Sequence, residues 1–560
     1  MLSSPVAALL ILFLAIARPG LAQTGAGTRT EPPSTQRAPS AADLRRGEYG
    51  RYRANNDLLH YVLDVRVDPD RRFISGTNTI RFRMIENDTR IQLELHPALQ
   101  VDGIVMEGRP LGHERVASTL YVDFPRALRA GETYEVDVRF SGQPAEQGRF
   151  GGMAFRKDPA GRHWINTANE GEGSSVWWPS KDQWRDEPDG MDIRVAVPNG
   201  LMDVSNGRFL GSTDLGDGYT RWDWRVHYPI NSYNVSLNIG RYVQFSERHG
   251  DLTLDYFVLP ENLDKARAQF AQVRPMIEAF ERFVGPYPFP KDGYKLIEVP
   301  YSGMEHQSAV TYGNRFANGY LERDWTGVGV SLKFDFIIIH ESAHEWFGNA
   351  VSAADVSDMW IQEGWTTYLE GVYVEALFGY EDALKYVNGY KSKVGNREPI
   401  ITQRGIHRTP NQDMYFKGAL FLHTLRSIVD DDERWWALLR AIYAEFAYRN
   451  IMTEDLVAFV NARLGQDLTP IFDQYLRRSA LPVLELTFDG EGGTVAYRWR
   501  ADERRFAMPV RVGSPGAWQV IRPTTDWQVM AYTGIPNEFR VATDLYYVEV
   551  VVLDASGRQP

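Results

Sequence analysis

The chain of 560 residues contains no cysteine. Disulfide bonds and thiolate metal sites are therefore excluded, and any metal ion has to be held by histidine and carboxylate side chains. Lys and Arg number 61 against 73 Asp and Glu, which gives a formal net charge of -12. This acidic balance argues against nucleic-acid binding, because such binding needs a basic face that displaces counterions.

Long apolar runs are also absent, since no segment beyond the N-terminus has about 18 apolar residues in a row. Residues 6–17 are apolar, with the length of a signal-peptide core, and Gly20-Leu21-Ala22 offers the small residues Gly20 and Ala22 for cleavage before Gln23. We therefore expect residues 1–22 to be a signal peptide, export to the periplasm or the extracellular space, and no stable membrane span after cleavage. Because no Lys or Arg precedes the run, an uncleaved anchor is the alternative.

The chain is too long for one ordinary domain, and its 43% hydrophobic and 24% charged residues are typical of a folded globular protein. Residues 23–50 are rich in Thr, Pro, Ser, Ala and Arg without an apolar period, which predicts a disordered linker. Between residues 51 and 246, apolar and polar residues alternate in short runs such as 61–67, and turn signals are frequent. This pattern predicts an N-terminal β domain of the sandwich kind.

Helical spacing replaces this alternation in residues 247–480. The expected helices cover residues 264–283, 332–350, 359–378, 416–428, 432–448 and 453–464. Alternation returns in residues 481–560, for example at 494–499 and 540–553, and predicts a small C-terminal β domain. The predicted fold class is therefore a multidomain α+β protein with a mostly helical central domain.

A metal-binding pattern lies in residues 336–346, which read FIIIHESAHEW. Residues four apart share one helix face, so His340 and His344 can point both imidazoles at one ion. Neutral imidazole is a good zinc ligand, and Glu341 can reach a water at the ion without binding the ion itself. A random chain of this composition carries the pattern His-Glu-x-x-His in roughly one case in a hundred. A further ligand is therefore needed to decide whether these residues form a metal site.

Glu363 supplies that ligand, 19 residues after His344 in a second stretch of helical spacing. Two antiparallel helices would bring it to the histidines. The combination arises by chance in on the order of one chain in a thousand, which disfavours two histidines buried only for packing. Two histidines and one glutamate leave a fourth position for water, which is typical of catalytic zinc sites. The sequence therefore predicts one Zn²⁺ ion.

These motifs resemble those of the zinc aminopeptidases of the aminopeptidase N and leukotriene hydrolase kind, within the thermolysin-like gluzincins. The family pattern is H-E-x-x-H, a gap of 18 and E, commonly as W-L-N-E-G-F, and residues 360–365 read WIQEGW. Residues 344–349 read HEWFGN, similar to H-Q-W-F-G-N. The resemblance covers residues 61 to 482. It implies a β saddle, a thermolysin-like catalytic domain and a small β sandwich, without the large C-terminal helical domain of many members.

Two further motifs carry roles that the resemblance implies. Residues 303–306 read GMEH where the family has G-x-M-E-N, so Glu305 is expected to bind the substrate's free α-amino group, although His306 replaces Asn. Residues 415–419 read YFKGA, similar to Y-x-K-G-A, so Tyr415 is expected to donate a hydrogen bond to the oxyanion.

The N-terminal β domain carries two weaker matches. Residues 167–170 read TANE, similar to T-Q-x-E, which makes Glu170 a second candidate for binding the amine, with Glu172 as the alternative. Residues 186–188 read DEP, an element that the family also has.

The resemblance implies a zinc-dependent aminopeptidase acting on peptides with a free N-terminus, in which Glu341 moves the proton from water to the leaving amine. A zinc endopeptidase with the same site is one alternative, and an exported, non-catalytic binding protein is another. Asp358 and Glu345 are candidates to hydrogen-bond the ligand imidazoles, although surface or capping roles are favoured for both. His423 is expected to pack rather than to bind the metal.

Overall fold

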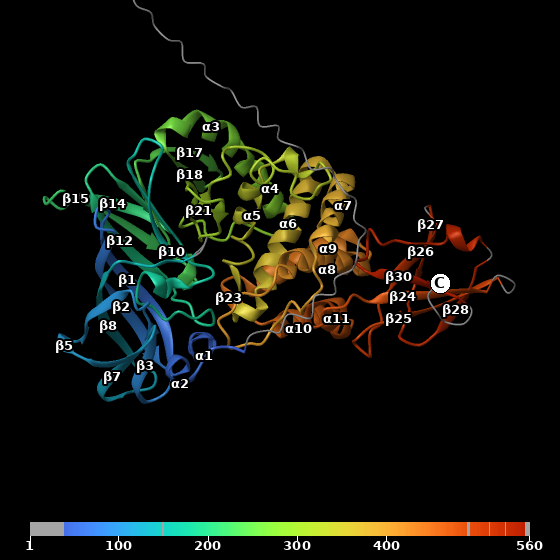
Figure 1. The fold of residues 1–560 in the computed structure, drawn as a ribbon, viewed down its shortest axis with the longest axis horizontal. Coiled ribbons are helices and arrows are strands. Elements are labelled where there is room, and N and C mark those ends of the chain that lie inside the picture. Colours follow the sequence, from blue (N-terminus) through green and yellow to red (C-terminus); the bar gives the residue numbers. More distant parts are fainter. Residues whose placement is uncertain (1–37, 148–150, 490–492, 515, 533, 555–560) are drawn as a thin grey trace, which may run out of the picture. The chain divides into compact units, whose positions relative to one another are not determined.

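The computed structural model describes residues 38–147, 151–489, 493–514, 516–532 and 534–554. The predicted signal peptide lies outside the described residues. From residue 39 onward the chain forms a β-rich part, then a mostly helical part, then a second β part (Figure 1). Across the described residues, no helix has both the length and the apolar character that a membrane span requires.

The N-terminal part is built around an eight-stranded sheet with the order β14-β15-β12-β1-β2-β8-β4-β5 (Figure 1). Its strands are β1 (Asn56–Asp68), β2 (Phe73–Met84), β4 (Leu99–Met106), β5 (Arg109–Pro110), β8 (Thr133–Gly142), β12 (Met191–Pro198), β14 (Arg208–Asp214) and β15 (Tyr219–Val226). The predicted alternation at residues 61–67 falls within β1, where the buried side chains alternate with partly exposed ones. One face of this sheet therefore contributes to a core, as the pattern indicates.

Two smaller sheets complete this part, one of order β13-β16-β11-β10-β9 and one of order β3-β7-β6. Their strands are β3 (Asp88–Glu94), β6 (Gly112–Val116), β7 (Thr119–Leu128), β9 (Glu146–Gln147), β10 (Gly151–Lys157), β11 (His163–Ala168), β13 (Met202–Ser205) and β16 (Leu237–Gly240). Side chains from all three sheets, including Val65, Leu93 and Ile239, belong to one hydrophobic core.

The predicted disordered linker, residues 23–50, is wrong over residues 41–47. These residues form helix α1 (Ala41–Gly47), and α2 (Arg51–Ala54) follows. The Ser40 hydroxyl accepts from the Asp43 amide at 3.1 Å, and the Asp43 carboxylate accepts from the Ser40 amide at 2.8 Å, which is a capping box. The buried Arg53 then donates to the carbonyls of Arg46 and Glu48, so tertiary contacts order a segment whose composition resembles a linker.

The central part combines a five-stranded sheet, β17-β18-β19-β21-β20, with helices. Residues 380–389 and 469–477 are helical although no helix is predicted there, and the helix predicted over residues 264–283 is divided in two by a 3₁₀ turn at residues 270–272. The strands are β17 (Val243–His249), β18 (Leu252–Val258), β19 (Tyr294–Glu298), β20 (Gly303–Met304) and β21 (Val310–Tyr312), with a separate pair, β22 (Val351–Ala353) and β23 (Arg449–Ile451). The helices are α3 (Leu263–Gln269), α4 (Val273–Phe283), α5 (Phe336–Ala343), α6 (Trp360–Phe378), α7 (Tyr380–Gly389), α8 (Asp413–Val429), α9 (Asp432–Phe446), α10 (Thr453–Leu464) and α11 (Thr469–Arg477).

Helix α5 is shorter than the predicted helix over residues 332–350. It begins after Asp335, whose carboxylate accepts from the amides of Ile337 and Ile338. The same carboxylate accepts from the Tyr312 hydroxyl at 2.7 Å, which fixes the helix start to the end of β21. The helix ends at Ala343, and Gly348 then adopts a φ of 126°, a conformation that no α-helix uses. Capping and the glycine thus set its length, rather than apolar spacing.

Helices α6 and α8 approach each other through two glycines. A Cβ placed on Gly418 would lie 3.0 Å from the Cα of Gly364, and one placed on Gly364 would lie 3.0 Å from the carbonyl oxygen of Met414. Glu363 is on α6 and Tyr415 is on α8, so this crossing sets the separation of two predicted site residues. The glycine of the Y-x-K-G-A motif therefore has a packing role.

The C-terminal part contains a four-stranded sheet, β28-β25-β24-β30, and a three-stranded sheet, β27-β26-β29. The strands are β24 (Val483–Asp489), β25 (Thr494–Arg500), β26 (Val510–Ser514), β27 (Ala517–Ile521), β28 (Gln528–Ala531), β29 (Arg540–Val541) and β30 (Glu549–Leu553). The predicted alternation over residues 540–553 is thus divided between two strands. Their buried side chains share one hydrophobic core with the helical part, and the Tyr475 hydroxyl donates to the Tyr547 carbonyl at 2.8 Å.

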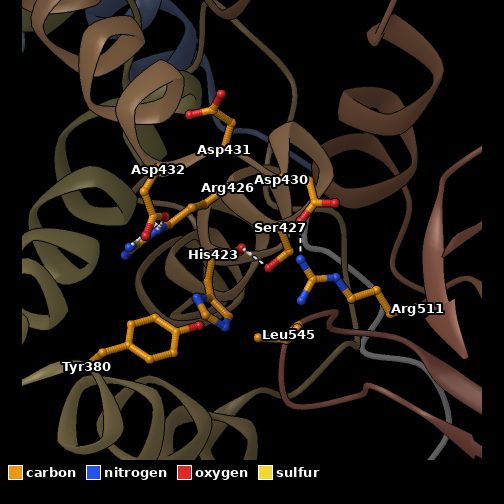
Figure 2. A pocket seen from close by; sticks show the side chains of 9 residues that line it. All are labelled: Tyr380, His423, Arg426, Ser427, Asp430, Asp431, Asp432, Arg511 and Leu545. Atoms are coloured by element: carbon orange, nitrogen blue, oxygen red, sulfur yellow. Dashed lines mark hydrogen bonds and ion pairs between the residues drawn. The ribbon is translucent and has the colours of Figure 1, made fainter. Parts of the chain in front are cut away.

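A polar pocket lies where α8 meets the C-terminal part (Figure 2). Arg426 pairs with Asp432 at 2.9 Å, and Arg511 pairs with Asp430. His423 lines this pocket, and its Nε2 lies 3.0 Å from the carbonyl oxygen of Asp544. These arginines pair with two of the three aspartates that line the pocket, and Arg426 also pairs with Glu375. None of the predicted metal ligands lines the pocket.

We predict that Gly418→Ala lowers the unfolding midpoint and the activity together, because the methyl group forces α8 away from α6. Overpacking of this kind costs about 1–3 kcal/mol, or several degrees in the midpoint at about 2–4 °C per kcal/mol. Thermal unfolding followed by circular dichroism measures the effect. Gly103→Ala is the matched control, since no atom lies within 4 Å of its added Cβ. Equal midpoints for the two variants would contradict the packing role.

Candidate metal centre and active site

The three predicted metal ligands converge as the sequence indicates. His340 and His344 come from α5 and its C-terminal end, and Glu363 comes from the first turn of α6. The Glu363 Oε2 atom lies 3.6 Å from His340 Nε2 and 3.3 Å from His344 Nε2. One ligand atom from each residue lies within 4.8 Å of the others, and all three residues are buried. This group can hold one metal ion.

The outer nitrogen of each imidazole has an acceptor that fixes the ring. His340 Nδ1 donates to Glu370 Oε1 at 2.7 Å, and His344 Nδ1 donates to the Phe347 carbonyl oxygen at 3.0 Å. Because each acceptor needs a proton on Nδ1, both Nε2 atoms present a lone pair to the Glu363 side of the site.

Glu370 was missed by the sequence reasoning. It follows Glu363 by seven residues on the same helix, and this two-turn spacing places both carboxylates on one face of α6. Its Oε2 also accepts from the Tyr386 hydroxyl at 2.6 Å. The spacing from Glu363 was the signal that could have found it.

The donor set fits a bound cation. Glu363 Oε2 is a buried atom without a hydrogen-bond partner among the described residues, and it faces the two Nε2 atoms. Burial acts to raise the pKa of Glu363, but without a bound cation protonated His344 and His340 would supply the positive charge instead, and their charges outweigh burial and lower that pKa. A buried carboxylate oxygen that faces only two lone pairs is stabilised by a cation bound between them.

Glu341 lies beside the metal-ligand group, on α5. Its neighbour is Gly303 of β20, where an added Cβ would lie 3.0 Å from Glu341 Cγ and 2.5 Å from Ile337 Cγ2. Because Gly303 has no side chain, β20 lies directly against the side of α5 that carries Glu341. Burial raises the pKa of Glu341 to about 7, and the charge of Glu305 acts in the same direction.

Glu305 and Glu170, the two candidates for binding an amine, both face this site. One carboxylate oxygen each of Glu305 and Glu341 lies within 4.8 Å of a His344 ring nitrogen. Glu305 Oε1 accepts from the Tyr233 hydroxyl at 3.1 Å, and the Asn349 amide donates to its carbonyl oxygen at 2.8 Å. Burial, then the charges of Glu305 and Glu363, raise the pKa of Glu170 well above its usual value. Glu170 Oε1 has no partner among the described residues.

Glu172, the alternative to Glu170, points elsewhere. Its side chain lies 3.9 Å from Arg46, and its carbonyl oxygen accepts from the same guanidinium. The structure therefore brings Glu170, and not Glu172, to the metal-ligand group.

Four carboxylates thus gather in one buried place: Glu170, Glu305, Glu341 and Glu363. Within the described ranges, no Lys or Arg forms an ion pair with any of them. Burial raises the pKa of Glu305 as well as those of Glu170 and Glu341. Such a concentration of acid is stable at neutral pH only with protons or with added cations, which makes the site a receptor for positive charge.

Tyr415 lies close to His340, and the centroids of the two rings are 6.2 Å apart. Burial, then the charge of Glu363, raise the pKa of Tyr415 well above its usual value, so its hydroxyl keeps its proton. His340, Glu341 and Tyr415 line one cavity of about 450 Å³. The phenol is therefore a proton donor on the wall of the cavity that reaches the metal-ligand group.

The sequence candidates for orienting the imidazoles have other partners. The Glu345 carboxylate accepts from the Tyr287 hydroxyl at 2.6 Å and from the Ser308 amide at 2.9 Å. The Asp358 carboxylate accepts from Arg404 at 2.7 Å and from the Thr453 hydroxyl at 2.6 Å. Both residues join neighbouring elements, so neither sets an imidazole tautomer.

His306 and His423 do not join the metal-ligand group. His306 is fully buried, and neither of its ring nitrogens has a partner in the described part of the chain. Burial lowers the pKa of His306 to about 3, so the residue that replaces Asn adds no charge beside Glu305. The expectation that His423 is no ligand agrees with its position in the separate pocket of Figure 2.

The arrangement is typical of H-E-x-x-H metal sites, in which two helices bring two histidines and a glutamate to one ion. Residues 269–475 match the peptidase family M1 domain. Tyr415 and the three predicted metal ligands all lie within the matched residues.

Among curated proteins, the chain is 24% identical over 450 residues to human aminopeptidase B, covering 72% of this chain and 65% of that protein. It is 24% identical over 331 residues to leucyl aminopeptidase of Saccharolobus solfataricus, covering 56% of this chain and 40% of that protein. The chain thus spans less than two thirds of the length of these relatives.

Among solved structures, an M1 zinc metallopeptidase mutant from Deinococcus radiodurans, bound to a Tyr-Ser-Ala substrate, has a TM-score of 0.63 and 22% sequence identity. The alignment covers 77% of this chain and 96% of that one. This likeness shows that the two chains share a fold.

We predict that Glu370→Gln weakens metal binding, because the His340 imidazole loses the carboxylate that fixes its tautomer. Loss of such a partner typically reduces metal affinity by about 10–100-fold. Competition with a chromogenic chelator measures the affinity without using activity. Glu381→Gln, an exposed glutamate in the first turn of α7, is the control and should bind metal like the wild type. An unchanged affinity in Glu370→Gln would rule out this orienting role.

Proposed function

We propose that the protein is a zinc-dependent aminopeptidase that hydrolyses the N-terminal peptide bond of peptides. The observation that carries this proposal is a pair of additional carboxylates, the buried Glu305 and the partly buried Glu170, beside the group of His340, His344 and Glu363. Metal binding uses only one of the four clustered carboxylates. The remaining negative charge suits the ammonium group of a free N-terminus. The names of the relatives, both aminopeptidases, agree with this assignment.

One zinc ion would be held by His340, His344 and Glu363, where it would polarise the scissile carbonyl and lower the pKa of a water molecule. The Glu341 carboxylate accepts a proton from the attacking water and returns it to the leaving amine. The Tyr415 hydroxyl donates a hydrogen bond to the carbonyl oxygen as that oxygen gains negative charge.

The amine site sets the register of the substrate. Glu305 and Glu170 bind the ammonium group, so only the first peptide bond reaches Glu341 and Tyr415. A blocked N-terminus leaves these buried carboxylates without a partner, which is strongly unfavourable. The one sequence feature that favours the endopeptidase alternative is His306 in the place of the family's Asn, and that side chain is buried and uncharged.

We predict that aminoacyl arylamides with a free amine are cleaved and that their N-acetylated forms are not. Chelation should abolish cleavage.

Glu305→Ala should reduce kcat/KM by roughly 100-fold or more, because an ion pair to a buried charge is lost. Glu341→Gln should reduce kcat by about 10²–10⁴-fold with its zinc content unchanged, because only the proton acceptor is removed.

Release of the arylamine measures each rate, and metal analysis checks that both variants keep zinc. Equal cleavage of free and acetylated substrates would replace the proposal with an endopeptidase. Zinc binding without cleavage of any substrate would favour the non-catalytic binding protein.

We also propose that the protein is exported, on the basis of the apolar run at residues 6–17 and the small residues Gly20 and Ala22. The expected mature N-terminus is Gln23. Sequencing the N-terminus of protein expressed with its full leader, together with fractionation, tests this. Recovery of the intact N-terminus in the membrane fraction would instead indicate the uncleaved anchor.

A further inference from the structure

The cavity beside the metal-ligand group continues along an aromatic wall. Phe336 stacks on His340 with ring centroids 5.2 Å apart, and Trp325 lies 5.7 Å from Phe336. The Lys393 ammonium lies 3.8 Å from the Trp325 ring centroid and 5.8 Å from that of Phe416. All five side chains line the same cavity of about 450 Å³. The rings of Trp325 and Phe336 therefore lie between the Lys393 ammonium and the predicted metal ligand His340.

Lys393 has no carboxylate partner among the described residues, whereas its neighbour in the same turn is engaged. Lys391 Nζ donates to the Thr543 carbonyl oxygen at 2.6 Å. The acid whose charge acts on Lys393 is Asp324, whose carboxylate accepts from the Gly329 amide at 2.6 Å and from the Ser331 hydroxyl. The contacts of the Lys393 ammonium are thus the faces of two aromatic rings, and the group is only half-buried. It is free to receive an anion.

The cavity lies away from the residues proposed to bind the amine. Glu305 and Glu170 do not line it, whereas Glu341 and Tyr415 do. A substrate whose ammonium group occupies the site of Glu305 and Glu170 has its scissile bond at Glu341, and the chain beyond that bond enters this cavity. Lys393 therefore meets the part of the substrate that leaves.

We propose that Lys393 determines specificity by binding a carboxylate on the leaving side of the scissile bond. The inference rests on the proposed aminopeptidase function. The carboxylate is either the free C-terminus of a short peptide or an acidic side chain just after the cleaved bond. An ammonium group fixed against aromatic faces and partly removed from water pairs with a carboxylate more strongly than an exposed lysine does.

The test compares matched substrates that share an N-terminal alanine. Ala-Ala is compared with Ala-Ala amide to probe the C-terminus, and Ala-Glu amide with Ala-Gln amide to probe the side chain. The enzymes are the wild type, Lys393→Met, Lys393→Arg and the control Lys385→Met, whose side chain on α7 is 61% exposed. An alanine arylamide, which has no carboxylate, reports the proposed function independently.

The wild type should prefer the acidic member of at least one pair by on the order of tenfold in kcat/KM, the usual size of a charge-assisted hydrogen bond. Lys393→Met should remove that preference and leave arylamide hydrolysis unchanged. Lys393→Arg and Lys385→Met should both retain it. The pair that responds identifies the source of the carboxylate.

Arylamide hydrolysis without any preference in the wild type, or with the same preference in Lys393→Met, would overturn the role of Lys393 and leave the aminopeptidase proposal standing. Absence of arylamide and peptide hydrolysis in the wild type would overturn the proposed function, and this inference with it.

Discussion

The arrangement of this site depends on one electrostatic constraint, which is that four carboxylates are buried together without a Lys or Arg partner in the described structure. Two imidazoles cannot balance four negative charges. A divalent ion at His340, His344 and Glu363, together with a substrate ammonium at Glu305 and Glu170, supplies three positive charges and so neutralises most of this negative charge. The charge balance thus links metal binding and recognition of a free N-terminus in one cluster.

The surrounding structure holds these groups in place through contacts that cannot easily shift. The Asp335 carboxylate fixes the start of α5 to β21, and Glu370 fixes the His340 ring from α6. The glycine crossing of Gly364 and Gly418 holds Tyr415 at its distance from Glu363. Each contact joins two elements that are distant in sequence, so the site is a property of the packed core rather than of one motif.

The sequence predicts the parts of this site whose spacing follows helix geometry. His340 and His344 share a face because they are four residues apart, and Glu363 follows from the expected second helix. The helices predicted over 359–378 and 453–464 are found close to their predicted limits, whereas the one predicted over 264–283 forms as two helices joined by a 3₁₀ turn. Apolar periodicity and turn residues are local signals, and they suffice for such elements.

Other features depend on contacts that a local pattern does not contain. Helix α1 was predicted as disordered because its composition is polar, whereas a capping box and the buried Arg53 order it. The shorter α5 reflects Asp335 and Gly348 rather than its apolar run. Glu370 lay within reach of a spacing argument, but Lys393 did not, since only the folded chain brings its turn to Trp325.

Anomalous diffraction at the zinc edge, from crystals grown with zinc, tests directly whether His340, His344 and Glu363 bind the metal ion. We expect one zinc peak at about 2.0–2.2 Å from His340 Nε2, His344 Nε2 and a Glu363 oxygen, with Glu305 and Glu341 unbound. A zinc ion held instead by Glu305, Glu341 and His344, the other buried group that can bind metal, would contradict this expectation. In that case Glu341 could not act as the proton acceptor, and Glu305 could not bind the substrate's amine.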